Sequence, residues 1–393
     1  MEIMLDLLLL FFVVILVTFV FGEIFFRFGV ARIIGQIIAG LFLGLPFFAG
    51  VIPLESNSLI LLLSEIGIIF LLILTGLEID FKKIMDSSKE VILIAFFSAL
   101  VPFVFGFGFA FFMGYPLIVC FVLGATLSLT AEGTKTITLM QAKVLKTKLG
   151  EIMILSGTAD DVFELLFLAV LLVLVGGSSL QGLILLPVEV IAFFVFVFVA
   201  LKLLPKFVSL FKQESDDGFF TLAVLIGLGI ALLSSALSLG PIVGALMAGL
   251  LLQKAIKSQK VEHAIENHLR IVTFGLVIPF FYVNVGLNFN FHDILLFPVI
   301  ALVVLFIAFT GKMAGVIATK PFSKLKMNQL LLTGWAMNSR GAMELVILEV
   351  ARQKIPGFPM QLYAAIVFMT IITTVAFPLA LQYYLKKYPD IMD

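Results

Sequence analysis

Apolar stretches of about 20 residues recur along the whole sequence, and each is long enough to cross a bilayer as an α-helix. Hydrophobic residues make up 62% of the chain and charged residues only 13%, which is more apolar side chain than a soluble domain can cover. The predicted fold class is therefore an all-α polytopic membrane protein. The polar residues between the stretches delimit thirteen predicted helices, at 3–25, 30–49, 57–77, 88–114, 116–142, 148–176, 179–204, 217–237, 241–258, 268–288, 291–319, 327–351 and 361–385.

The first apolar stretch, MEIMLDLLLLFFVVILVTFVFGEIFF, lacks the basic n-region and the small-residue cleavage site of a signal peptide. We therefore predict a retained first helix. Cys120 is the only cysteine, which excludes an internal disulfide and a cysteine metal cluster. We expect no cofactor and no nucleic-acid partner, and the lipid bilayer is the predicted surrounding.

Lys and Arg residues are distributed unevenly among the predicted loops. Most of the 25 follow odd-numbered helices, whereas the loops after even-numbered helices hold only Arg352 and Lys354. Because cytoplasmic loops are enriched in basic residues, the odd-numbered loops are predicted to be cytoplasmic. This alternation predicts an N-terminus outside the cell and a C-terminus in the cytoplasm.

Several ionisable residues remain at membrane depth after the loops are assigned. They are Glu65, Glu132, Lys135, Asp160, Asp161, Glu164, Lys312, Arg340 and Glu344. Each costs about 2.5–3.5 kcal/mol even on the lenient insertion scale, and such residues commonly mark an ion or substrate path. Structural ion pairs that hold the bundle together are the alternative. The concentration of these residues on the fifth, sixth, eleventh and twelfth predicted helices favours a path.

Asp160 and Asp161 lie side by side near the middle of the predicted helix at 148–176. Two neighbouring carboxylates in a low dielectric cannot both ionise comfortably unless a cation lies between them. Such a site either holds protons or exchanges them for a bound cation. Na+ prefers oxygen ligands, which carboxylates, Thr hydroxyls and backbone carbonyls would supply. Glu164 follows at helical spacing on the same face, although a role at the rim of the site is favoured for it.

Two predicted helices carry polar residues and glycine at mid-span, in LSLTAEGTKTI (127–137) and AMNSRGAMEL (336–345). Interrupted helices in corresponding halves of a chain indicate the binding site of a transporter. If the second to sixth and the ninth to thirteenth helices are two repeats, each interrupted helix is the fourth of its repeat. One repeat then starts inside and the other outside, so the repeats are inverted.

An interrupted helix leaves partial positive charge at one half-helix N-terminus and partial negative charge at the C-terminus of the other half. Glu132 is a candidate for balancing the positive end, and Arg340 or Lys312 for balancing the negative end. Glu344 is a further candidate for compensating the dipole of a half-helix. The alternative for Glu132 is a simple ion pair with Lys135, three residues on, in a continuous helix.

Eight short stretches, in their order and spacing, carry a resemblance to a known family. They are GQIIAGLFLG (35–44), SEIGIIFLLILTGLEID (64–80), GTADDV (157–162), GPIVGALMAGLLL (240–252), IPFFYVNVGLNF (278–289), TGKMAGV (310–316), NSRGAMELVI (338–347) and TTVAFPL (373–379). From about residue 5 to 385 the chain resembles the monovalent cation:proton antiporters. The matching branch holds bacterial and archaeal sodium/proton antiporters and glutathione-gated potassium efflux systems.

The resemblance implies an inverted-repeat fold in which residues 1–393 form one transporter domain. Residues 3–81 and 217–288 would form a scaffold that usually makes a homodimer. Residues 88–176 and 291–387 would form an ion-binding core with two crossed, discontinuous helices, and 179–204 would link the two parts. Transport in such proteins is thought to move the core against the scaffold like an elevator.

The resemblance also implies roles for particular residues. Asp161 would be the main ion-binding and proton-carrying group, and Thr130 would lend an oxygen from the interrupted helix. Asp160 would pair with Lys312 when no cation is bound. An Asp-Asp pair with a lysine on the eleventh helix resembles the electrogenic exchangers, whereas electroneutral relatives tend to show Asn-Asp and the potassium efflux branch Gln-Asp.

The fifth predicted helix departs from the family pattern. Thr130 is followed by Ala131 and Glu132, where Thr-Ser is common. Ala131 is therefore a secondary site candidate, and Glu132 is a candidate third carboxylate of the ion site. Lys135 is also outside the family pattern, and the sequence assigns no role to it.

The favoured hypothesis is a secondary transporter, not an enzyme, that exchanges Na+ or Li+ for protons across a prokaryotic cell membrane. K+/H+ exchange on the same fold is the alternative. A Na+-coupled organic-anion symporter and a gated cation channel are rivals from other classes. His263 and His268 could sense pH in the cytoplasmic loop before the tenth helix, although a solvated surface is favoured there.

Overall fold

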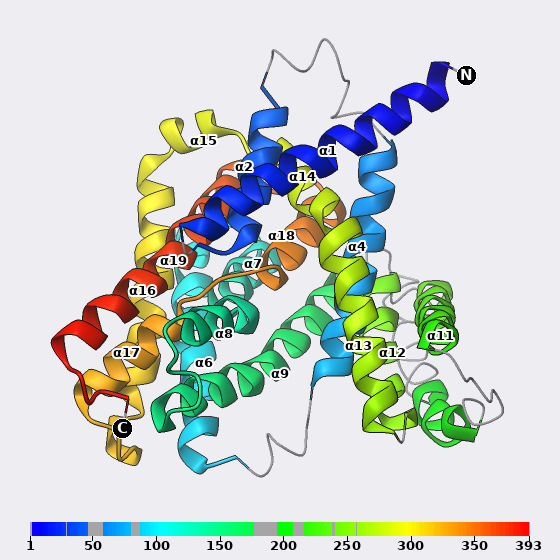
Figure 1. Ribbon diagram of the computed structural model, residues 1–393. Helices are drawn as coiled ribbons and strands as arrows, with labels where there is room; N and C mark the ends of the chain where they lie inside the picture. Colours follow the sequence, from blue (N-terminus) through cyan, green and yellow to red (C-terminus); the bar gives the residue numbers. More distant parts are fainter. Residues whose placement is uncertain are drawn as a thin grey trace. The chain divides into compact units, whose positions relative to one another are not determined.

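The computed structural model describes residues 2–28, 30–45, 58–79, 87–176, 195–206, 216–237, 240–256 and 258–392 (Figure 1). All regular secondary structure in these residues is helical, which confirms the predicted all-α class. Seven of the described helices are long and apolar enough to cross a membrane. Three shorter apolar helices, of 10–17 residues, accompany them.

Every predicted span contains helix in the described part of the chain. The helices are α1 (Glu2–Arg27), α2 (Arg32–Leu43), α4 (Ser58–Glu78), α6 (Lys89–Phe112), α7 (Leu117–Ser128), α8 (Glu132–Gln141), α9 (Lys148–Gly176), α11 (Asp216–Ala236), α12 (Gly240–Ala255), α13 (Gln259–Val272), α14 (Ile278–Asn288), α15 (Phe291–Leu296), α16 (Pro298–Ala318), α17 (Met327–Met337), α18 (Met343–Lys354) and α19 (Met360–Lys387). Residues 195–206 are also helical. Parts of the predicted spans 30–49, 57–77, 179–204 and 241–258 lie outside the described residues.

The fifth and twelfth predicted helices are both interrupted where glycine and polar residues stand at mid-span. α7 ends at Ser128 and α8 begins at Glu132, with extended backbone at Leu129 (φ −73°, ψ 156°) and Ala131 (φ −78°, ψ 113°) between them. α17 ends at Met337, and α18 begins six residues later in the sequence. The alternative of a continuous fifth helix is therefore wrong.

The tenth predicted helix begins earlier than expected. Residues 259–267, assigned to a cytoplasmic loop, form the start of α13, so His263 and His268 both lie on a helix. The segment QKVEHAIENHLRIV is amphipathic, and its low mean hydropathy hid the helix from a prediction based on apolar runs. α13 continues through a π-helical stretch, Thr273–Val277, into α14.

The eleventh predicted helix is divided in two. Expected as one helix over 291–319, it separates into α15 and α16 at Phe297. Pro298 explains the break, because proline lacks the N–H of a helix interior and disfavours helical backbone in the residue before it. Proline is favoured at the first position of a helix, and Pro298 is the first residue of α16.

The chain divides into two compact units. One comprises Met1–Thr18, Leu43–Ile79 and Leu172–Asn284, and the other comprises Phe19–Phe42, Asp80–Leu171 and Val285–Asp393. The division into scaffold and core inferred from the sequence stays a prediction.

In the first unit α4 packs against α12, and α12 packs against α11. A Cβ on Gly76 of α4 or on Gly249 of α12 would collide with the backbone of the other helix. Small residues at this crossing therefore set how closely the two helices approach. Arg270 of α13 donates to Glu78 of α4 (2.5 Å) and to Glu266 (2.9 Å).

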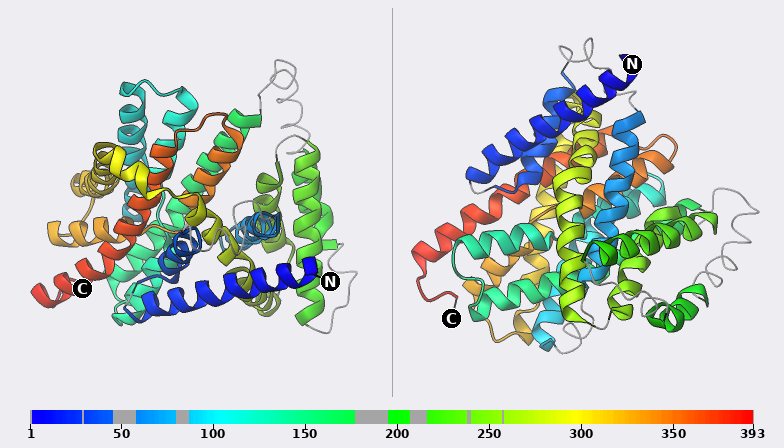
Figure 2. Two further views of the ribbon diagram at one scale, coloured as in Figure 1. Left: turned by 90° about the horizontal axis from the view of Figure 1, so that it is seen from above. Right: turned by 45° about the vertical axis from the view of Figure 1, so that its right-hand side comes forward.

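In the second unit α6 packs against both α7 and α16 (Figure 2). A Cβ on Gly311 of α16 would meet Pro102, and a Cβ on Gly315 would collide with the Phe97 carbonyl of α6. These two glycines bring α16 against α6. The close packing places Lys312, the residue after Gly311, in the interior of the unit with 0% of its surface exposed.

Candidate ion-binding site

The two helix interruptions meet in the second unit. The Ala131 N–H donates to the Ser339 carbonyl (2.8 Å), and the Thr130 hydroxyl donates to the Met337 carbonyl (3.0 Å). Figure 1 shows the chain passing from α17 to α18 between α7 and α8. Backbone groups freed by the breaks are thus satisfied by each other, which is how irregular backbone is tolerated at membrane depth.

A buried ion pair lies next to this junction. Lys312 Nζ of α16 is 3.1 Å from Asp160 Oδ2 of α9, and it also donates to Thr130 Oγ1 (2.7 Å). Asp160 and Thr130 are each 1% exposed. The expected pairing of Asp160 with Lys312 is present in the structure, and the lone pair that Thr130 could offer to a cation faces the lysine.

Arg340 lies between α17 and α18, but its guanidinium is directed at the end of another helix. Nη1 donates to the carbonyls of Thr126 (3.2 Å) and Leu129, and Nη2 donates to the Leu127 carbonyl (2.7 Å). These carbonyls close the C-terminus of α7, where the helix dipole concentrates partial negative charge. The Arg340 side chain is fully buried.

Acidic residues lie at the N-termini of the half-helices α8 and α18. Glu132 is the first residue of α8, and its Oε1 accepts a hydrogen bond from Thr158 Oγ1 of α9 (2.9 Å). Glu344 lies in the first turn of α18, and its Oε1 accepts from the Gly341 N–H (2.6 Å). Negative charge at a helix N-terminus is stabilising, so both positions suit a carboxylate.

Several buried polar atoms around the junction have no hydrogen-bond partner in the part of the chain that the structure describes. They are Asp160 Oδ1, Ser156 Oγ, Asn338 Oδ1 and Ser339 Oγ. Buried oxygens are normally satisfied, and orphaned ones are usual where a water or an ion is bound. Ser156 precedes Asp160 by one helical turn, so their two orphaned oxygens share a face of α9.

Asp161, the next residue, is half-buried, so its carboxylate is the more accessible of the pair. Both aspartates lie on the helix that faces Lys312 and the start of α8. The side chain of Glu164 lies outside the described residues, so its predicted role stays a prediction. Glu65 is exposed and lies on α4, which belongs to the other unit.

A second buried polar cluster was not predicted. Glu349 of α18 is 0% exposed and accepts hydrogen bonds from Arg352 (2.6 and 2.9 Å), Gln353 (2.9 Å) and Tyr363 of α19 (3.4 Å). The spacing of three residues between Glu349 and Arg352 was a signal for an ion pair. The burial of Glu349 is a result of tertiary packing, which no local pattern reveals. Ser156 was missed because the sequence does not show which hydroxyls the packing buries without a partner.

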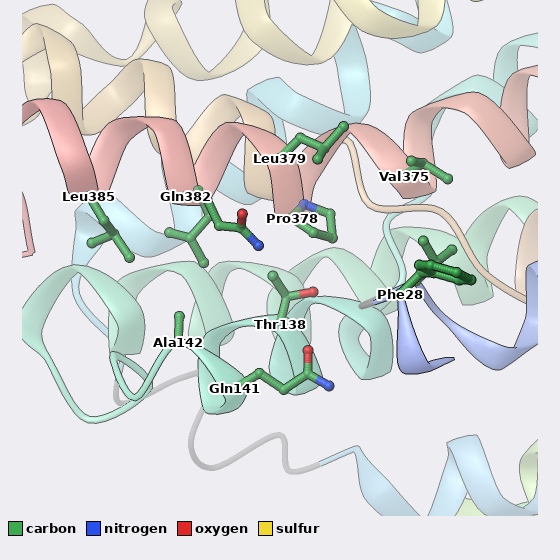
Figure 3. Close-up of a pocket in the computed structure, with 11 residues that line it drawn as sticks. Phe28, Thr138, Gln141, Ala142, Val375, Pro378, Leu379, Gln382 and Leu385 are labelled. Atoms are coloured by element: carbon green, nitrogen blue, oxygen red, sulfur yellow. The ribbon is translucent and has the colours of Figure 1, made fainter. Parts of the chain in front are cut away.

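A pocket of about 440 Å³ lies elsewhere in the second unit, between α8 and α19 (Figure 3). Its lining is mainly apolar, with Thr138, Gln141 and Gln382 as the polar contributors. Among the lining residues that the structure describes, none is charged and neither aspartate of the candidate site is present. The pocket is therefore separate from the candidate ion-binding site.

The contact between the interruptions predicts a coupled pair of substitutions. A Cβ on Gly341 would lie 2.5 Å from Ala131 Cβ, so Gly341→Ala is expected to lower the free energy of unfolding by about 1–3 kcal/mol. The melting temperature in detergent reports the loss. Ala131→Gly removes the opposing Cβ. Ala131→Gly should therefore lower the free energy of unfolding less in the Gly341→Ala background than in the wild type. Equal costs in the two backgrounds would contradict the contact.

A bundle of apolar helices, with two interrupted helices meeting beside a buried aspartate–lysine pair, defines a secondary transporter. The model of the family described as sodium/hydrogen exchanger, transmembrane, matches residues 8–387. The chain therefore belongs to the sodium/hydrogen exchanger family, which confirms the resemblance found in the sequence. It is a multi-pass membrane protein and not an enzyme.

Known relatives match along nearly the whole chain. A Na(+)/H(+) antiporter of Enterococcus hirae is 29% identical over 95% of this chain and 97% of its own. The Na(+)/H(+)-K(+) antiporter GerN of Bacillus cereus is 25% identical over 94% of each chain. The solved structure of the sodium proton antiporter MjNhaP1 from Methanocaldococcus jannaschii superimposes with a TM-score of 0.69 at 18% identity, covering 100% of this chain and 98% of that one. The last likeness establishes the fold.

Proposed function

We propose that the chain is a secondary active antiporter that exchanges Na+ or Li+ for protons at the Asp160–Asp161 pair. One observation carries the proposal: a buried lysine holds Asp160 at the meeting point of two interrupted helices, while Asp161 beside it stays half-buried. The E. hirae relative, named a Na(+)/H(+) antiporter, supports sodium as the cation.

Competition for the same oxygens couples the two fluxes. When protons occupy the pair, the carboxylates offer little to a cation. When the protons leave, Asp161 and Asp160 can bind Na+, with further oxygens from Thr130 and Ser156. Lys312 then has to release Asp160 Oδ2 and Thr130 Oγ1, so the cation and the ammonium exclude each other.

This exchange would be electrogenic if more than one proton leaves for each cation. Two carboxylates share the site with Lys312, so the site holds enough titratable groups for a second proton. We also propose a homodimer in a prokaryotic cell membrane, with the N-terminus outside, the C-terminus in the cytoplasm, and the core moving against the scaffold. The distribution of Lys and Arg along the sequence supports this orientation.

K+/H+ exchange is the second candidate. The name of the GerN relative, which is 25% identical to the chain, includes both Na+ and K+. Either cation would use the same carboxylates, and only the preference differs.

Proteoliposomes with an internal pH-sensitive dye test both candidates. Na+, Li+ and K+ are added in turn to vesicles that hold a proton gradient, and the dye reports proton movement. A response to Na+ and Li+ supports the proposal, whereas a response to K+ alone favours the second candidate. In the Na+ assay, K+ with valinomycin on both sides should accelerate exchange if it is electrogenic, and leave an electroneutral exchanger unchanged.

The same vesicles separate the exchanger from its rivals. Cation flux without counter-movement of protons, at rates far above those of carriers, would identify a channel. Sodium uptake that requires an organic anion would identify a symporter. Either result would overturn the antiporter proposal.

A further inference from the structure

Lys135 is a second fully buried lysine beside the candidate site, and the exchange cycle proposed above does not use it. It lies one turn into α8, with 0% of its surface exposed. Its Nζ is 3.9 Å from the sulfur of Met337, the last residue of α17, at the helix junction. An ammonium at such a position is costly unless an anion lies close to it.

Gly157 of α9 provides the place where this ammonium lies. A Cβ on Gly157 would collide with Lys135 Nζ, so only glycine leaves room for the lysine against α9. Glu132 flanks the same glycine, with its Cγ 3.9 Å from such a Cβ. The first turn of α8 therefore directs both of its charged side chains at residues 157–158 of α9, as the hydrogen bond from Thr158 to Glu132 also requires.

Asp161 follows Gly157 by four residues, which places the two on one face of α9 with their Cβ positions about 5–6 Å apart. Helical side chains lean toward the N-terminus and cover the turn before them, so the Asp161 carboxylate leans toward the position of the Lys135 ammonium. The Glu132 carboxylate accepts from the Thr158 hydroxyl. Helix spacing thus leads us to expect Asp161 to face a lysine of α8, whereas the contact of Asp160 with Lys312 of α16 is present in the structure.

We propose that Lys135 is the tethered counter-cation of Asp161, which the transported cation displaces when it binds. The inference deepens the proposed function, on which it rests. Each aspartate of the pair then has its own lysine: Asp160 has Lys312, and Asp161 has Lys135. Because a bound Na+ must compete with the ammonium at Asp161, Lys135 sets the cation affinity of the site. It acts through Asp161 and is a positioning residue.

Removing the ammonium should tighten cation binding. An opposite charge within about 4–6 Å changes the affinity of a carboxylate for a cation by about 1–3 logarithmic units. Because Asp161 is half-exposed, we expect a change at the lower end of this range. In Lys135→Met the apparent KM for Na+ is therefore expected to fall by about tenfold, measured at the alkaline end of the active range, where protons compete least. The maximal rate is not expected to rise.

Three further variants make the test specific. Gly157→Ala keeps the lysine but pushes its ammonium away from α9, so its KM should fall in the same direction. Lys135→Arg keeps the charge and should restore a KM near that of the wild type. Lys202→Met removes an exposed lysine elsewhere, one that lies over the Phe198 ring, and should leave the KM unchanged.

Sodium-dependent proton movement in proteoliposomes, at graded Na+ concentrations, gives the KM of each variant. A KM that is unchanged or raised in both Lys135→Met and Gly157→Ala would overturn the inference and point to a pair between Lys135 and Glu132 within α8. If Lys135→Met is not recovered as folded protein, the direction of the shift in Gly157→Ala decides. Absence of exchange in the wild type would instead be a failure of the proposed function, so the two failures are distinct.

Discussion

Asp161→Asn is expected to abolish cation/proton exchange and to leave the protein folded. Asparagine has the size of aspartate, but it can neither carry the proton nor supply the charge that binds the cation. Because Asp161 is half-buried, the amide can also be accommodated without a large loss of stability. Sodium-driven proton movement in proteoliposomes should fall to the leak of vesicles without protein.

The same substitution at another carboxylate tests whether the loss of exchange is specific to the candidate ion-binding site. Asp390→Asn makes the same change at an exposed residue near the C-terminus and should leave exchange at the wild-type rate. Gel filtration and the melting temperature in detergent should be the same for both variants and for the wild type. Full activity in folded Asp161→Asn would refute the assignment of the ion site.

Arg340→Met is expected to produce the largest loss of stability. The guanidinium donates to three carbonyls at the C-terminus of α7, and methionine would leave these buried groups without a donor. A buried acceptor left without its donor costs about 1–3 kcal/mol, so the loss of three such hydrogen bonds should lower the free energy of unfolding by at least about 3 kcal/mol. The melting temperature of the purified protein should fall accordingly, and exchange should be lost, because α7 ends next to Thr130.

Arg340→Lys separates charge from geometry. A lysine keeps the positive charge at the helix end but lacks the planar fork that reaches several carbonyls at once, so an intermediate loss of stability is expected. A melting temperature in Arg340→Met equal to that of the wild type would contradict the role of this residue at the end of α7.

Much of the fold could be predicted from the sequence because the signals are local. Each apolar run correctly indicated helix in its predicted span. Glycine with polar residues at mid-span predicted both interruptions. The break at Pro298 was also a local signal, but the apolar run on both sides of it hid the division of α15 from α16. The start of α13 was missed because that segment is amphipathic rather than apolar.

The candidate site was predictable in composition, and the resemblance also predicted the pair of Asp160 with Lys312, but the other contacts of the site were not predicted. Its aspartates, lysines and arginine are conspicuous because charge is rare at membrane depth. That Arg340 would cap α7 rather than a half of its own interrupted helix depends on how the two interruptions pack. The same holds for Lys135, whose position over Gly157 follows from the packing of α8 on α9.

The central claim is that cation and proton compete for the aspartate pair, and calorimetry tests it most directly. Purified protein is titrated with NaCl in two buffers that differ in ionisation enthalpy, with Asp161→Asn as the control. The account predicts heats that differ between the buffers, because protons leave as Na+ binds, and no binding heat in the variant. Equal heats in both buffers, with sodium bound, would mean that the cation displaces no proton and would contradict the account.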